Sequence, residues 1–372
     1  MTAASPTLPP ASGEAPTSPL AVVAIWGKHL LAFVLPASSL AFLLSAPHRW
    51  YFALPWLLVI LVSLAIDKLA SGELRQPAKD LPDWPFDAVL YVLVVLQLAT
   101  VGLLVRMVAL QGLFSMDSLV GLLLVGVNSG YSGIVVAHEL IHRREARFQW
   151  LGRLLLCSVL YEHFYTEHLR GHHNRVGTAE DPATARFGET FRQFWRRTVP
   201  GQFRSAWRLE TKRLGDELMK PWDPRLLRSR VVHGLVVEWG VALAILFLVG
   251  PGAFAIYLLQ ALIAVRLLEA VNYFEHWGLV RTGRRVTPID SWDTDSWFTL
   301  YTLVGLSRHS DHHANASRPY AQLRHFSESP KLPSGYFGMV DMVLFRNAEF
   351  RERMTEELRR RKLGPFAEGA SA

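Results

Sequence analysis

Long apolar runs separated by polar segments are the dominant pattern of this chain. A helix needs about 20 residues to cross the roughly 30 Å hydrocarbon core of a bilayer. The runs approach this length and are almost free of charge, which is unusual for core helices of soluble proteins. The pattern predicts membrane-spanning helices at about 29–46, 50–66, 86–105, 118–137, 231–250 and 252–271. The first two runs are short or contain proline.

The rest of the chain divides into a lead, two polar blocks and a tail. Residues 1–20 are rich in Pro, Ser and Ala, lack the features of a signal peptide, and are expected to be disordered. Residues 21–345 are expected to form one membrane domain, from which the blocks 138–230 and 272–345 protrude. Residues 346–372 are expected to form a charged tail. We therefore predict an all-α integral membrane protein with about six transmembrane helices.

Basic residues are distributed unevenly between the two sides of such a protein. Of the 39 lysines and arginines, 18 lie in 138–230 and 14 in 272–372, on the same side as the 67–85 loop, which holds three more. The opposite loops, 47–49 and 106–117, hold one each. The positive-inside rule therefore predicts that both termini and both polar blocks are cytoplasmic, in an inner membrane of the bacterial type. This topology accounts for the net charge of +7, and nothing suggests a nucleic-acid partner.

Histidines are concentrated in the two polar blocks. Nine of the 14 fall in the motifs "HELIH", "EHLRGHH", "NYFEHWG" and "RHSDHH": His138, His142, His168, His172, His173, His276, His309, His312 and His313. Residues three or four apart share one helix face. Convergence is therefore expected for His138 with His142, for His168 with His172, and for His309 with His312 and His313. Nine imidazoles are too many for one metal ion, so the pattern predicts a two-metal site between facing helices.

The other histidines have simpler explanations. A single histidine is usually exposed or a satisfied core residue, and we apply this interpretation to His29, His48, His233 and His325. His163 lies close to the second motif in sequence, and we expect it to contact the metal-binding histidines without binding the metal itself.

"HELIH" alone also matches HExxH, the zinc protease helix with two histidine ligands and a glutamate base. This alternative explains His138, Glu139 and His142 and leaves six motif histidines without a role. Ligand spacing does not distinguish zinc from iron, because imidazole binds both. A non-enzymatic metal-binding protein is less consistent with the pattern, since the histidines lie outside the spans rather than along a pore.

Together the four motifs resemble those of the membrane alkane hydroxylases, within the superfamily of membrane fatty-acid desaturases and hydroxylases. The family pattern reads HExxHK, EHxxGHH, NYxEHYG and QRHSDHH, and this chain reads "HELIHR", "EHLRGHH", "NYFEHWG" and "SRHSDHH". The stretches "GTAEDPATARFGE" and "LPSGYFGM" are also similar, and the resemblance covers roughly 85–345. Arg143, Trp277 and Ser307 depart from the pattern, but no departure removes a histidine.

The resemblance implies two non-haem iron ions held by the nine histidines. Four acids beside them are expected to orient the imidazoles: Glu139, Glu167, Glu275 and Asp311. The implied reaction uses O2 to hydroxylate the terminal carbon of a medium-chain alkane or a similar hydrophobic molecule drawn from the membrane lipid. Lipid desaturation and hydroxylation of an alkyl aromatic remain alternatives. The single cysteine, Cys157, excludes an iron–sulfur or rubredoxin-type site in this chain, so a separate rubredoxin or ferredoxin-type protein is expected to donate electrons.

Two smaller features concern the spans. Glu238 and Arg266 are charged residues inside predicted spans, and they are expected to pair with each other. Gly126, Gly130 and Gly133 have a spacing that is typical of close helix packing. A widened substrate channel is the alternative interpretation of these glycines.

Overall fold

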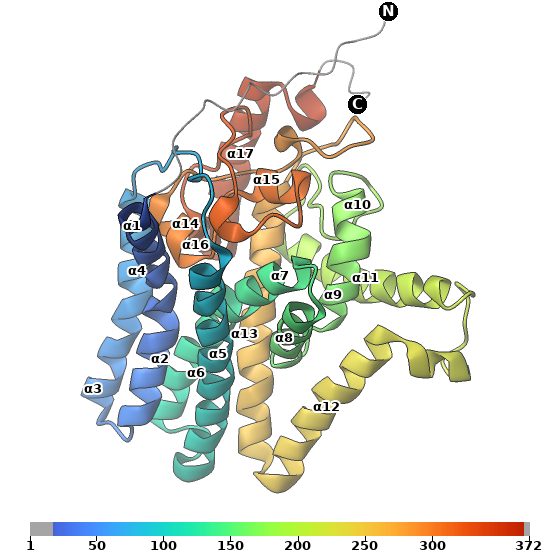
Figure 1. Cartoon of the computed structure of the whole chain (residues 1–372). Helices are drawn as coiled ribbons and strands as arrows, with labels where there is room; N and C mark the ends of the chain where they lie inside the picture. Colours follow the sequence, from blue (N-terminus) through green and yellow to red (C-terminus); the bar gives the residue numbers. More distant parts are fainter. Residues whose placement is uncertain (1–17, 368–372) are drawn as a thin grey trace, which may run out of the picture.

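The computed structural model describes residues 18–367, and this part of the chain is helical, with isolated bridges but no strand of a sheet. Figure 1 shows long helices side by side in the lower part of the molecule and shorter helices over its upper end. The upper end carries α15 (His309–Ala314) and the upper ends of α7 (Val135–His142) and α13 (Pro251–His276). We call it the histidine end.

Six helical segments are long and apolar enough to cross a membrane, which confirms the six predicted spans. They are Pro19–Ser45 (α1, η1, α2), Trp50–Leu69 (α3, η2, α4), Asp83–Gln111 (α5), Met116–His142 (α6, η3, α7), Arg230–Leu248 (α12) and Pro251–His276 (α13). The first span begins inside the segment predicted to be disordered. Ser18 caps it by accepting a hydrogen bond from the Ala21 N–H, and Pro19 suits the first helical position. The rest of that prediction, for residues 1–17, lies outside the described residues.

One part of the block 138–230 lies deeper than the sequence predicts. After α7 the chain forms α8 (Ala146–Cys157), turns, and returns through α9 (His163–Glu167). The carbonyl oxygens of Cys157 and Ser158 accept hydrogen bonds from Tyr257 and Gln260, which belong to the lower half of α13. The apolar run of α8 is too short to cross a bilayer, so residues 146–167 form a re-entrant hairpin. Its turn is tolerated at this depth because the backbone is buried in protein.

Close contacts and buried polar side chains join the central spans. The Gln97 side chain of α5 donates to Ser129, and the Ser129 hydroxyl donates to Gln260 of α13. The three glycines of the fourth span each face a neighbouring side chain with no room for a methyl group: Gly126 faces Ile263, Gly130 faces Leu267 and Gly133 faces Gln97. These contacts confirm the interpretation of the glycine spacing as close packing.

The ion pair expected between Glu238 and Arg266 is absent from the described residues, and that prediction is wrong. The Glu238 carboxylate accepts a hydrogen bond from the backbone N–H of Glu162, at the turn of the re-entrant hairpin. The Arg266 guanidinium lies over the rings of Phe191 and Trp195, 5.1 and 5.6 Å from their centroids. The sequence-based interpretation did not anticipate the hairpin, which gives Glu238 its partner.

A buried carboxylate ties the histidine end to the spans. Asp67, near the end of α4 (Leu58–Leu69), accepts hydrogen bonds from the hydroxyls of Ser296 and Thr299, at the start of α14 (Trp297–Thr302). It also accepts the backbone N–H of Gly338, in the first turn of α16 (Tyr336–Phe345). One carboxylate thus satisfies donors at the beginnings of two helices.

The segment predicted as a charged tail is a packed helix over most of its length. Helix α17 (Asn347–Arg361) exposes its charges and buries Phe350, Met354 and Leu358 in the main core. The other helices at the histidine end are η4 (His168–His172), α10 (His173–Arg175), η6 (Pro288–Asp290), η7 (Tyr320–Gln322) and η8 (Gly364–Phe366). Helices α11 (Phe191–Arg213) and η5 (Pro224–Arg228) belong to a projection at the side of the bundle.

Candidate metal centre

Four separate parts of the fold bring the nine motif histidines together. The histidines come from α7, from the segment α9–η4–α10, from the end of α13 and from α15. They form two groups, within each of which the candidate ligand nitrogens lie within 4.8 Å of one another. The five-histidine group is His138, His142, His168, His173 and His312, and the four-histidine group is His172, His276, His309 and His313.

The second motif is divided between the groups, contrary to the expectation from α-helical spacing. Its segment η4 is a turn of π-helix, and a π-turn brings residues five apart together where an α-helix brings residues four apart together. His168 therefore meets His173, with 3.1 Å between their Nε2 atoms, and not His172. A second π-segment, η3 (Ser129–Ile134), lies directly below α7 in the fourth span.

The fourth motif is divided as well. His309 and His313 are four residues apart in α15 and meet at 2.9 Å between their Nε2 atoms, whereas His312 belongs to the other group. Asp293 fixes the start of this short helix, since its carboxylate accepts the Ser310 N–H at 2.7 Å. A helix of six residues can thus serve both groups because its neighbouring residues point in different directions.

Distances between ring nitrogens match those around a metal ion. In the four-histidine group the Nε2 atoms of His276 and His309, His309 and His313, and His313 and His172 are 3.3, 2.9 and 3.3 Å apart. In the other group, His173 Nε2 lies 3.1 Å from that of His168 and 3.2 Å from that of His312. Nitrogens bound to one ion at about 2.1 Å, at about 90 to 109°, are about 3.0 to 3.4 Å apart.

Hydrogen bonding among the rings cannot replace a metal here. A neutral imidazole carries one proton, so crowded Nε2 atoms cannot each be matched by a donor. The Nε2 atoms of His138 and His142 are buried without any hydrogen-bond partner. Burial also lowers the pKa of His168, His309 and His312 well below the usual histidine value, which keeps these rings neutral, as metal ligands must be. The donor set therefore fits two metal ions.

An aspartate that the sequence analysis did not identify orients one of the histidines. The Asp181 carboxylate accepts a hydrogen bond from His172 Nδ1 at 2.9 Å, and the Thr184 hydroxyl donates to the same oxygen. Burial raises the pKa of Asp181, but His172 and the two hydrogen bonds outweigh burial and hold it at about 2. Asp181 thus remains ionised and leaves His172 Nε2 free to face the four-histidine group. It lies in "GTAEDPATARFGE", one of the stretches that carry the family resemblance.

Three of the four acids expected to orient histidines bind arginines. Glu139 pairs with Arg143, Glu167 with Arg175, and Asp311 with Arg318 and Arg324. The Arg143 contact occupies the glutamate that a zinc protease would use as its base, which weakens that alternative. Arg143 lies within the motif "HELIHR", four residues after Glu139, whereas the arginine partners of Glu167 and Asp311 lie seven to thirteen residues away and outside the motifs.

Glu275 is the one acid of the four that contacts a ring nitrogen. Its Oε2 lies 3.2 Å from His309 Nε2, and its Oε1 accepts the Tyr336 hydroxyl at 2.6 Å. Tyr336 also belongs to a stretch that carries the family resemblance, "LPSGYFGM". Glu275 therefore lies at the edge of the four-histidine group and is positioned by a buried tyrosine.

The remaining histidines lie outside both groups. His29 is surrounded by the rings of Phe86, Tyr301 and Tyr320, His48 binds Asp117, His233 binds the Leu227 carbonyl, and His325 binds Asp295. His163 packs between Tyr161 and Phe203, and no motif histidine is among its ring contacts. Its expected supporting role is therefore not seen.

A narrow apolar cavity leads from the spans to the histidines. It has a volume of about 30 Å³ and touches His138, His168, His309 and Glu275, and the rest of its wall is mostly apolar, including Ile134, Leu268, Val271 and Leu306. Gly130 also lines it. The cavity has room for about one water molecule, so a hydrocarbon would fit only by moving these side chains.

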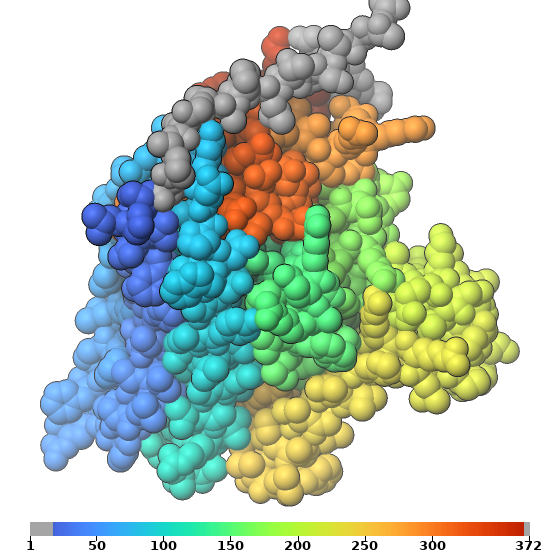
Figure 2. Space-filling view, viewed as in Figure 1, coloured from blue at the N-terminus to red at the C-terminus, as the bar shows by residue number. Residues whose placement is uncertain are grey.

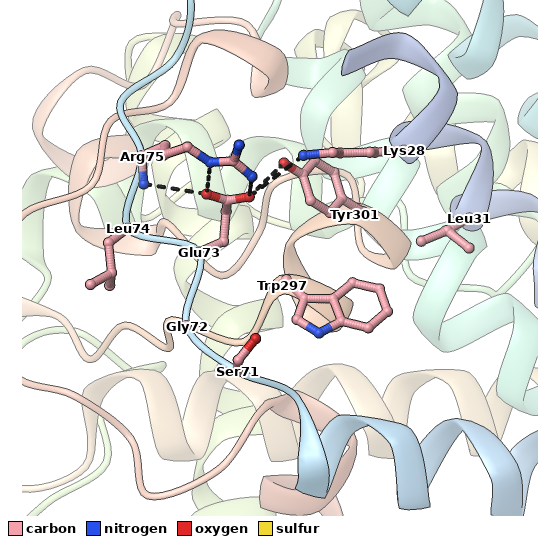
Figure 3. A pocket seen from close by; sticks show the side chains of 9 residues that line it. All are labelled: Lys28, Leu31, Ser71, Gly72, Glu73, Leu74, Arg75, Trp297 and Tyr301. Carbon is pink, nitrogen blue, oxygen red and sulfur yellow. Dashed lines mark hydrogen bonds and ion pairs between the residues drawn. The ribbon is translucent and has the colours of Figure 1, made fainter. Parts of the chain in front are cut away.

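A wider cavity lies elsewhere and has both polar and apolar walls. Figure 3 shows it between α1, the chain after α4 and α14, with a volume of about 640 Å³. Its charged groups are already paired: Glu73 binds Arg75 through two hydrogen bonds, accepts the Tyr301 hydroxyl, and lies 3.7 Å from Lys28. It contains none of the motif histidines.

Comparisons with known proteins agree with this geometry. The fatty acid desaturase family model matches residues 116–341, which include all nine motif histidines. Alkane 1-monooxygenase 1 of Pseudomonas aeruginosa is 41% identical over 68% of this chain and 69% of its own length. Alkane 1-monooxygenase 2 of the same organism is 38% identical over 80% and 82%. The hydroxylase component XylM of a Pseudomonas putida xylene/toluene monooxygenase is 26% identical over 55% of each chain.

The family model extends over the last three of the six spans, all of the first polar block and most of the second. The relatives and the apolar helices together identify a multi-pass membrane enzyme, and the two histidine groups identify a place that can hold metal. The chain is an oxidoreductase that belongs to the alkane 1-monooxygenase family, within the larger fatty acid desaturase family.

Proposed function

We propose that the nine motif histidines hold two iron ions and that the enzyme hydroxylates the terminal carbon of medium-chain alkanes. The observation that carries the proposal is the convergence of nine ring nitrogens into two compact groups. The reaction is RH + O2 + 2 electrons + 2 protons → ROH + H2O. Bound iron would supply the binding and reductive activation of O2, which zinc cannot do.

The protein contributes orientation and exclusion of water. Asp181 holds His172 in place through Nδ1, the nitrogen that faces away from the four-histidine group. Glu275 lies instead against His309 Nε2, so its carboxylate would face the metal position itself. Helix α7 and the end of α13 are buried, so the ring nitrogens face a space closed to bulk water. An alkane that entered from the bilayer through the apolar cavity would reach His138 and His309 with one end first. Positioning of this kind favours the terminal carbon, although its C–H bonds are the harder ones to break.

Electrons would come from outside the chain. Cys157 is buried at the end of α8 and belongs to neither histidine group. We propose that a rubredoxin or ferredoxin-type protein docks at the histidine end. The basic balance of this end supports a cytoplasmic orientation in an inner membrane.

The first prediction concerns iron. The purified protein should contain about two iron ions per chain, and His142→Ala and His276→Ala should each lower this content and abolish turnover, because each removes a ligand from a different group. Iron analysis and octane turnover with a supplied electron donor measure both effects. His233→Ala is the matched control and should resemble the wild type, since His233 binds a backbone carbonyl far from either group.

Two outcomes would contradict the proposal. Full activity with zinc in place of iron would exclude redox chemistry at the histidines. Internal alkenes or secondary alcohols as the main products would exclude end-on presentation of the alkane. A preference for alkyl aromatics, as the name of the XylM relative suggests for that protein, would change the substrate and leave the metal centre as proposed.

A further inference from the structure

The segment between α10 and α12 extends away from the bundle. Helix α11 runs crosswise to the spans in Figure 1, and together with residues 214–229 it forms the projection on the right of Figures 1 and 2. We call residues 191–229 the arm. Its first part packs on α9 and α13, and its end leads directly into α12. Nothing in the proposed reaction uses this projection.

A ridge of unpaired cations follows α11. Its members are exposed and succeed one another at intervals of four or eight residues, so they form one slowly winding row along the helix: Arg192, Arg196, Arg204, Arg208 and Lys212. None of these five, which we call the cation ridge, has an acidic partner among the described residues. The two cations of the cavity in Figure 3 differ, because both Lys28 and Arg75 have Glu73 as an acidic partner.

An aromatic row lies beside the cation ridge. Trp195, Phe203 and Trp207 each precede a member of the ridge and are half-buried, and Val199, also half-buried, continues the row between them. Beyond α11, the chain exposes three large apolar side chains almost fully: Leu218, Trp222 and Leu227 are 89%, 77% and 75% accessible. We call these three the apolar tip. Aromatic and apolar groups beside arginines are typical of helices that lie in the membrane interface.

The depth of the arm agrees with such a location. Helix α12 has 19 residues, which measure about 28 Å along its own axis at 1.5 Å per residue. Figure 1 shows this axis inclined to the other spans, so the start of α12 at Arg230 lies at or just below the headgroups. On α13, Arg266 is 15 residues above Pro251, or about 22 Å, and its exposed side chain lies against Phe191 and Trp195 of α11. Its long side chain can reach the headgroups from there. Both spans therefore place the arm at the boundary between hydrocarbon and headgroups.

We propose that the arm is a binding surface for anionic phospholipids, with the cation ridge on the phosphates and the apolar tip inserted between the lipids. Five cations without acidic partners need counter-charges, and headgroup phosphates supply them at this depth. An acidic protein would complement the charges, but it would leave the apolar tip in water. The inference does not depend on the metal or the substrate.

Retention of lipid by the full-length protein tests the cation ridge. The protein is purified in a neutral detergent, mixed with phosphatidylglycerol or phosphatidylcholine, and the lipids held per chain are counted by native mass spectrometry. The wild type should prefer phosphatidylglycerol. Replacing Arg204, Arg208 and Lys212 by Gln should weaken this binding on the order of 100-fold, since each cation near an anionic surface contributes about five-fold.

The control removes the same charge elsewhere. Arg353, Arg359 and Arg360 of α17 are exposed and lie on the far side of the histidine end from the spans, so replacing them by Gln should leave lipid retention unchanged. Equal retention by the two variants would overturn the proposal. Unchanged lipid retention combined with slower reduction by an acidic electron donor would also overturn it, and would assign the cation ridge to protein docking.

A fluorescent label tests the apolar tip. The sole native cysteine is buried, so Leu218→Cys can be labelled selectively with an environment-sensitive dye. In nanodiscs its emission should shift to the blue and be quenched by lipids brominated near the headgroup, whereas a label at Arg359→Cys should remain in water. A label at Leu218→Cys that is quenched only from the aqueous phase would show that the apolar tip does not enter the membrane.

Discussion

Asp181 shows how much of the metal centre depends on one residue outside the histidine motifs. Its carboxylate is 1% accessible and accepts hydrogen bonds from His172, Thr184 and the Ala183 N–H. These contacts leave His172 one ring orientation. A histidine without such a hydrogen-bond partner is not fixed in orientation or tautomer, and it therefore binds metal more weakly.

We therefore predict that Asp181→Ala lowers the iron affinity of the four-histidine group about 10- to 100-fold, with a smaller effect on the five-histidine group. Asp181→Asn should lie between the two, because an amide oxygen can accept the ring N–H but carries no charge. Iron content during titration with a chelator measures the effect. Glu180→Ala is the matched control: its exposed side chain contacts no motif histidine, and equal iron loss from both variants would contradict the role of Asp181.

The sequence predicts the set of histidines better than their arrangement. All nine fall in the two groups because the motifs give their identity. Their division could not be predicted, because the π-turn at η4 changes which residues of the second motif lie together. The pair of Glu139 with Arg143 follows the i,i+4 spacing of a helix and could have been predicted. The arginine partners of Glu167 and Asp311 depend on tertiary contacts that spacing does not encode.

At the level of secondary-structure elements, the Asp67 carboxylate binds the beginnings of both α14 and α16. Asp67 accepts hydrogen bonds from Ser296, Thr299 and Gly338, and its own side chain is buried. Removing the carboxylate would leave these donors buried and unpaired, at a cost of about 1–3 kcal/mol each.

We predict that Asp67→Ala lowers the free energy of unfolding by at least about 2 kcal/mol and the Tm by about 3 °C or more. Thermal unfolding in detergent measures the change. Asp341→Ala is the control, because Asp341 forms partly exposed ion pairs with Lys68 and Arg346 that contribute about 1 kcal/mol or less. Equal destabilisation by the two variants would mean that Asp67 is no more than a surface charge.

Six spans follow from the sequence because hydrophobic length is a strong signal. The re-entrant hairpin does not, since the 12 residues of α8 are too few for a span and too apolar for an ordinary loop. Its position depends on α12 and α13, which come much later in the chain. The same is true of Glu238, whose partner could be named only once the hairpin was seen to lie beside it.

The whole molecule carries a net charge of +7, and most of its cations lie at the histidine end. An acidic electron donor should therefore associate faster at low salt. We predict that turnover with rubredoxin or ferredoxin falls as ionic strength rises from about 0.01 to 0.15 M, mainly through the association rate. The control is a small uncharged reductant, whose rate should not change. Turnover that is indifferent to salt with the protein donor would contradict charge-steered docking.

The re-entrant hairpin also imposes an order on biosynthesis. Cys157 and Ser158 find their partners 100 and 102 residues later, at Tyr257 and Gln260. At about 5–20 residues per second, the ribosome needs on the order of 5 to 20 s to make that stretch. Until then the hairpin has no protein to cover its turn at membrane depth, so it must enter the bundle after the later spans arrive.

The reactivity of Cys157 can measure the time between synthesis of the hairpin and its burial. In ribosome-bound chains that end before α13, Cys157 should react with a membrane-permeant thiol reagent, and in the finished protein it should be protected by burial. Pulse labelling of stalled chains of increasing length measures when protection begins. If Cys157 were already fully protected in chains that lack α13, the hairpin would reach its depth without the later spans. In that case α12 and α13 would pack against a hairpin that is already in its final position.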